Sequence, residues 1–83
     1  MTNQSWDKQR EALRELLKEL RTTKAKMTQA ELSEVLGKPQ SYISKYENGE
    51  RKLDYIEIRE ICEVLGVSMR KFSDLYEKRF KRV

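Results

Sequence analysis

Four side chains able to hydrogen-bond to base pairs recur at helical spacing in one short stretch of the sequence: Gln40, Ser41, Ser44 and Lys45. A glutamine amide can donate to and accept from the N6 and N7 edge of adenine at once, and a lysine reaches guanine acceptors or phosphate oxygens. Serine suits several bases, and no acidic group in this set opposes a polyanionic partner. The stretch therefore predicts a helix that reads base edges in the major groove of double-stranded DNA. The alternative for the same residues is a polar helix face that meets only water.

A second set of side chains flanks this stretch and is suited to holding the sugar–phosphate backbone. Gln29 follows Thr28 at a predicted helix N-terminus, whose unpaired N–H groups attract phosphate. Arg51 and Lys52 come just after the predicted reading helix, where cations set the register of a protein on DNA. The Tyr42 hydroxyl suits either a phosphate or a base. We expect the DNA backbone contacts to come from Gln29, Tyr42, Asn48, Arg51 and Lys52.

Two short helices joined by a tight turn are needed to present these side chains, and local signals predict both. Thr28 and Glu31 have the spacing of a capping box, in which each side chain satisfies a free N–H group at a helix start. Gly37 suits the left-handed residue that ends such a helix. Pro39 stands at or beside the start of the next helix, which an Asn-Gly pair stops. The pattern predicts a helix-turn-helix over residues 28–48.

Apolar residues at helical spacing predict which faces are buried and where the other helices lie. The inner faces of the two short helices are expected to contain Ala30, Leu32, Val35 and Leu36, and then Ile43 and Tyr46. Further helices are predicted at about residues 6–21, 54–65 and 68–80, with Ser5, Asp54 and Ser68 as caps and a break at 22–26. The connections are short, so we expect an all-α, five-helix orthogonal bundle forming a single domain over residues 1–83.

The distribution of charge supports a phosphate-bearing partner more than the net charge of +4 does by itself. Residues 21–52 contain seven basic and four acidic groups, and residues 70–83 contain six basic and two acidic groups. Residues 53–69, by contrast, contain one basic and four acidic groups. Positive charge is therefore concentrated in two blocks, an arrangement that favours binding to phosphates through neutralisation of their charge.

Several classes of function are disfavoured by composition. The sequence has no His and one Cys, so neither a zinc site nor an internal disulfide is expected, and Cys62 is interpreted as a small buried apolar residue. A lone cysteine fits a reducing cytoplasm, where we expect the protein to act. No apolar run approaches membrane-spanning length, and no signal peptide is visible. We expect no enzyme activity, metal, cofactor or small-molecule ligand, because no catalytic grouping of side chains is present.

The run TQAELSEVLGKPQSYISKYENGERKLD, at residues 28–54, resembles the Cro/phage-repressor-like (Xre) helix-turn-helix family, and EVLGVS at 63–68 continues the resemblance. That resemblance implies a lambda-repressor-like DNA-binding domain that binds operator DNA and mostly represses transcription. It also implies that Glu47 pairs with Arg21 and pins the reading helix to the scaffold. The loop before residue 28 is one residue longer than is usual, with Ala25-Lys26 where the family has a glycine.

The resemblance further implies a homodimer on a palindromic operator. The last predicted helix contains Phe72, Tyr76 and Phe80, more aromatic surface than its own core is expected to cover, so we predict the dimer contact there. Such a dimer places two reading helices about 34 Å apart along the DNA. The alternative is a module on the same fold that binds a protein partner, such as an antitoxin. Its short ends favour DNA binding, because an antitoxin usually offers an extra flexible arm.

Overall fold

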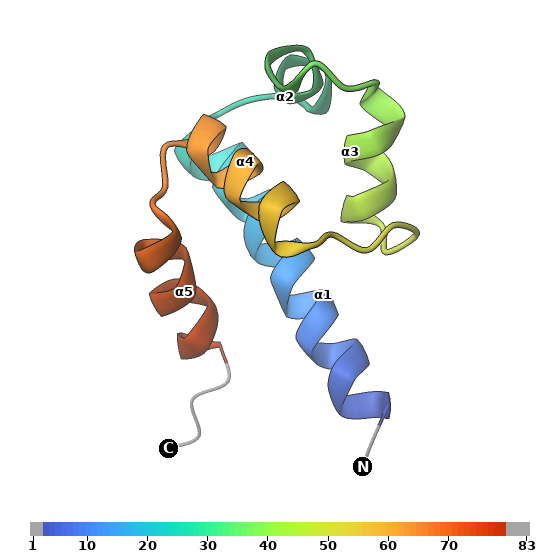
Figure 1. Cartoon of the computed structure of the whole chain (residues 1–83), viewed down its shortest axis with the longest axis vertical. Helices are drawn as coiled ribbons and strands as arrows, with labels where there is room; N and C mark the ends of the chain where they lie inside the picture. Colours follow the sequence, from blue (N-terminus) through green and yellow to red (C-terminus); the bar gives the residue numbers. More distant parts are fainter. Residues whose placement is uncertain (1–2, 80–83) are drawn as a thin grey trace.

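The computed structural model describes residues 3–79 as an all-α chain with no strand in that range. Its elements are α1 (Asn3–Glu19), the π-helical segment η1 (Leu20–Lys24), α2 (Gln29–Leu36), α3 (Gln40–Glu47), α4 (Tyr55–Leu65) and α5 (Met69–Lys78). α1 forms the long axis of the molecule and packs against α3 and α5. α2 is seen end-on in Figure 1 while α3 runs down the page, so these two helices cross steeply. The predicted five-helix bundle is confirmed.

One buried cluster holds these helices together, and every α-helix contributes to it. Leu17, Leu32 and Ile43 come from α1, α2 and α3 and have no exposed surface. α4 adds Cys62, which is free and buried, and burial raises the pKa of its thiol to about 11. The cysteine is therefore an apolar packing residue, as predicted. No helix in residues 3–79 is both long and apolar enough to cross a membrane.

Both ends of the first helix differ from the prediction. Helical structure begins at Asn3, so Ser5 lies inside the helix and not at its predicted cap position. The expected break at residues 22–26 is also wrong in part, because the chain stays helical to Lys24 as a π-turn, closed by the Ala25 N–H donating to the Leu20 carbonyl at 2.9 Å. A π-turn contains one more residue than an α-turn, so the chain leaves the helix one residue later. Lys26 then takes the left-handed conformation, with φ of 54°.

The predicted starts of α2, α4 and α5 are confirmed, and so are the predicted ends of α2 and α4. The Thr28 hydroxyl accepts from the Glu31 N–H at 3.0 Å, and the Glu31 carboxylate accepts from the Thr28 N–H at 2.8 Å. Asp54 and Glu57 repeat this reciprocal box on α4, and Ser68 caps α5. Gly37 ends α2 in the left-handed conformation. These local contacts fix where α3 begins relative to α2.

Removing the α2 cap is expected to weaken the fold measurably. Thr28→Ala leaves N–H groups at the start of α2 without partners, and we expect it to lower the free energy of unfolding by about 1 kcal/mol. Thr28→Ser keeps a hydroxyl at the same place and is expected to stay within a few tenths of a kcal/mol of the original protein. Urea denaturation of the two variants measures the difference, and equal stabilities would contradict the role of the cap.

The predicted inner face of α2 is wrong in detail. Ala30 is exposed and Val35 is 60% exposed, whereas Ser33 is buried and its hydroxyl donates to the Ala30 carbonyl at 2.8 Å. A serine that satisfies its hydroxyl within the helix can be buried at little cost, which the apolar pattern does not reveal. Leu32 and Leu36 are buried and half-buried, as expected.

The aromatic residues of the last helix also lie differently from the prediction. Phe72 is only 4% exposed and closes the core, so it is not available as a dimer contact. Tyr76 is half-buried, and its hydroxyl donates to the Gln9 carbonyl at 3.0 Å. The helix ends at Lys78, and Phe80 lies outside the described residues. The expected aromatic patch is therefore largely used to attach α5 to α1.

Candidate nucleic-acid interface

α3 is buried along one side and polar along the other. Ile43 and Tyr46 face the core, with 0% and 1% of their surface exposed. Tyr42 packs its ring edge against Tyr46, with centroids 5.8 Å apart and ring planes at 78°. This is a favourable aromatic arrangement within α3. Because Ile43 and Tyr46 are buried against the core, the opposite face of α3 points outward.

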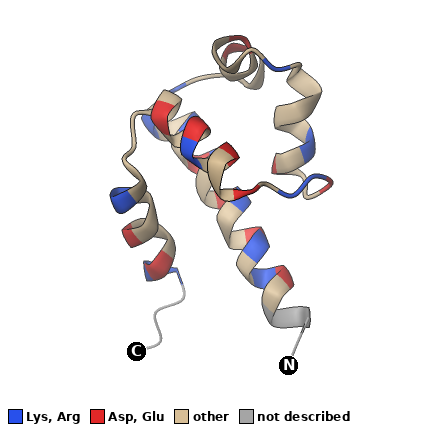
Figure 2. Cartoon of the chain, in the orientation of Figure 1, with Lys and Arg blue, Asp and Glu red and all other residues tan. Residues whose placement is uncertain are grey.

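The structure brings the four predicted base-reading residues together on that outward face. Gln40, Ser41 and Lys45 are exposed, and Ser44 is half-buried with its hydroxyl donating to the Ser41 carbonyl at 3.3 Å. Lys45 is the one basic residue of α3, and the loop that follows α3 adds basic residues (Figure 2). A mostly neutral hydrogen-bonding face with cations beside it suits base edges in the groove and phosphates at its margin.

A buried ion pair fastens α3 to the end of the first helix. The Arg21 Nε donates to one Glu47 carboxylate oxygen at 2.7 Å, and Arg21 Nη2 donates to the other at 3.0 Å. The side chains are only 7% and 5% exposed, and Arg21 Nη1 also donates to the Met27 carbonyl at 2.7 Å. The pair links segments 26 residues apart in the sequence. It fixes the height and rotation of α3 relative to α1.

The Glu47 carboxylate also contacts Gln29, which in turn contacts Gln40, and both glutamines are expected on the DNA. Gln29 Nε2 donates to Glu47 Oε1 at 2.9 Å, and Gln40 Nε2 lies 3.5 Å from Gln29 Oε1. Sequence reasoning placed Gln29 on phosphate and missed its contact with Glu47, because nothing local in the sequence indicates a pairing across 18 residues. The capping box already satisfies the Glu31 N–H at the start of α2, and the first two N–H groups of an α-helix have no intrahelical partner.

Two basic side chains, Lys38 just before α3 and Arg51 just after it, lie beside the Tyr42 ring, and an ion pair partly neutralises the charge of Arg51. Arg51 lies over the Tyr42 ring at 4.9 Å and is paired with Glu57, a hydrogen bond that raises the pKa of the guanidinium. Lys38 approaches the same ring at 5.3 Å, and burial raises the pKa of the Tyr42 phenol. Tyr42 is therefore mostly a packing residue, with only its rim at the surface. Lys52 is exposed and has no ion pair within residues 3–79.

Asn48 shapes the turn that ends α3. Its Oδ1 accepts from the Glu50 N–H at 3.0 Å, and its Nδ2 donates to the Glu50 carboxylate at 3.2 Å. The side chain expected on the DNA backbone is thus engaged within the turn. No group of three potential metal ligands occurs in the described part of the chain.

Comparison with known proteins supports the interpretation of this geometry. A family model described as helix-turn-helix matches residues 17–72, which is more than half of the chain and includes α2, α3 and α4. A solved structure of an XRE-family like protein from Pseudomonas syringae pv. tomato str. DC3000 superposes with a TM-score of 0.86 and 36% sequence identity, covering 96% of both chains. Among curated proteins, none matches. The chain belongs to the XRE family of DNA-binding helix-turn-helix proteins.

Proposed function

We propose that this protein binds double-stranded DNA sequence-specifically by placing α3 in the major groove, and that it represses transcription in the cytoplasm. The observation that carries the proposal is the outward face of α3. Gln40, Ser41 and Lys45 are exposed there, and Ile43 and Tyr46 on the opposite face are buried in the core. Rigid presentation matters because bidentate base contacts, worth about 1–3 kcal/mol each, are lost when the helix shifts. Arg51 and Lys52 are proposed to hold the phosphates beside the groove.

The proposed reader acts as a homodimer on a palindromic operator. The two shorter extents of the molecule are 25 and 21 Å, so two copies fit side by side when their reading helices are about 34 Å apart. Since Phe72 is internal, it does not contribute to the contact between copies. Sedimentation with and without operator DNA tests the dimer. A single 10.0 kDa chain in both states would contradict it.

Replacing Gln40 separates base reading from backbone binding. Gln40→Ala is expected to cost about 1–3 kcal/mol on the preferred sequence and to relax preference at one base pair per half-site. Arg51→Ala is expected to weaken binding about equally on every sequence, because phosphate contacts contain no base information. Fluorescence anisotropy on the preferred duplex and on single-base variants measures both effects. Equal losses for Gln40→Ala on all duplexes would contradict its role as a base reader.

A further inference from the structure

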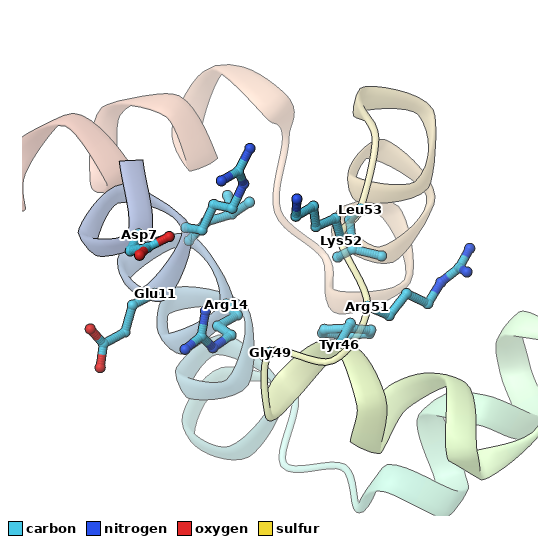
Figure 3. Close-up of a pocket in the computed structure, with 10 residues that line it drawn as sticks. Asp7, Glu11, Arg14, Tyr46, Gly49, Arg51, Lys52 and Leu53 are labelled. Carbon is cyan, nitrogen blue, oxygen red and sulfur yellow. The ribbon is translucent and has the colours of Figure 1, made fainter. Parts of the chain in front are cut away.

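A hollow of about 520 Å³ lies between the first half of α1 and the loop that joins α3 to α4 (Figure 3). Its apolar wall includes Leu13 and Leu53, both half-buried, and its α3 side ends at Tyr46 and Gly49. The volume falls within the range of sites that bind small organic ligands. This hollow is separate from the outward face of α3, and of its lining residues only Arg51 and Lys52 belong to the proposed DNA contacts.

Basic side chains from both walls meet in this hollow. Arg10 and Arg14 come from α1, and Lys52 comes from the loop and extends toward α1 in Figure 3. None of these three has an ion pair or hydrogen bond within the described part of the chain. The acidic lining residues are Asp7 and Glu11, and Glu11 points away from the loop (Figure 3). With Arg51, which is paired with Glu57, the lining contains four basic and two acidic residues, so positive charge is in excess.

Arg14 is the least exposed of the three cations. It is half-buried, and partial burial of a cation without a counter-ion costs solvation energy. The guanidinium lies against Gly49, where a Cβ built on the glycine would be 3.1 Å from Arg14 Cζ. Gly49 has φ of +91°, a conformation that other residues rarely adopt. The loop thus leaves room for a guanidinium, and the contact holds Arg14 at the edge of the hollow.

We infer that this hollow binds a phosphate group, with Arg10, Arg14 and Lys52 as its cationic partners and Leu13 and Leu53 contacting any apolar body attached to it. Guanidinium groups suit phosphate because their fork of N–H donors matches two phosphate oxygens at once. The phosphate can come from a free phosphorylated small molecule or from the DNA strand beside the α3–α4 loop. Both sources present the same chemistry to the three cations, and the experiment below separates them.

The first arm of the test uses the protein alone and does not depend on DNA binding. Inorganic phosphate, AMP and adenosine are titrated at constant ionic strength while amide resonances are followed by NMR. We expect saturable shifts of the Gly49 and Leu53 amides with phosphate and AMP, and none with adenosine, which lacks the anion. Arg14→Gln and Arg10→Gln should each weaken AMP binding about tenfold. The matched variant Arg59→Gln, on α4, removes the same charge outside the hollow and should leave binding unchanged.

The second arm identifies the source and rests on the proposed DNA binding. If the DNA strand supplies the phosphate, Arg14→Gln lowers the slope of log affinity against log salt by about one for each copy bound, and AMP competes with the duplex. If a free phosphorylated ligand supplies the phosphate, Arg14→Gln leaves the salt slope of DNA binding unchanged and weakens only the binding of AMP. The dispersion of the NMR spectrum verifies that each variant is folded. The absence of saturable shifts at Gly49, together with an unchanged salt slope for Arg14→Gln, would overturn the inference.

Discussion

Glu47→Ala is expected to lower the free energy of unfolding by about 3–5 kcal/mol, the cost of leaving a buried charge without its partner. Arg21 is 6% exposed, and without the carboxylate its guanidinium keeps only the Met27 carbonyl. Domains of this kind have total stabilities of about 5–15 kcal/mol, so the variant loses much of its stability. Urea denaturation measures the change. The loss of specific DNA binding should exceed what unfolding explains, because Gln29 also loses its contact with Glu47.

Two comparison variants separate the charge effect from the loss of packing. Glu34→Ala removes an exposed carboxylate from α2 and is expected to change stability by less than about 0.5 kcal/mol. The double variant Arg21→Met with Glu47→Leu removes both charges and is expected to recover most of the lost stability. If Glu47→Ala cost less than about 1 kcal/mol, the pair would not be holding α3 in place.

The affinity for operator DNA is expected to fall steeply with salt. Two copies that each place Arg51 and Lys52 on phosphates, with or without Lys45, neutralise about four to six phosphates. Each neutralised phosphate contributes about 0.9 to the slope of log affinity against log salt, so affinity should fall about 10²- to 10³-fold between 50 and 200 mM salt. Fluorescence anisotropy at several salt concentrations gives the slope.

A pair of lysine variants tests which cations are responsible. Lys52→Gln removes an exposed charge at the proposed interface and should reduce the slope by about one for each copy bound. Lys71→Gln removes an exposed charge from α5 and should leave the slope unchanged. A slope near zero for the original protein, or equal changes in the two variants, would contradict the proposed orientation on DNA.

Local signals in the sequence were sufficient for the helix-turn-helix itself. A capping box and a left-handed glycine act within one turn of backbone, so Thr28, Glu31 and Gly37 predicted the limits of α2 correctly. The same reasoning worked for Asp54 and Ser68 at the starts of α4 and α5. These features need no information about the rest of the chain.

Contacts between distant segments were less predictable. The helical spacing of apolar residues placed Phe72 on the apolar face of the last helix, but it did not indicate whether the core of the same chain or a second copy covers that face. In the structure, Phe72 is buried in the core of its own chain. Arg21 lies in the π-turn at Leu20–Lys24, and the local sequence indicates neither this turn nor the contact of Arg21 with Glu47. The Gln29 contact with Glu47 and the convergence of Arg10, Arg14 and Lys52 likewise exist only once the helices pack.

Selection of bound duplexes from a random DNA pool tests the central claim most directly. The original protein and Gln40→Ala are compared under the same salt conditions. We predict that the original protein enriches an inverted repeat whose half-sites are centred about 10 base pairs apart, and that Gln40→Ala loses information at one position of each half-site. A pool that shows no common motif after repeated selection, or an identical motif for Gln40→Ala, would contradict base reading by the outward face of α3.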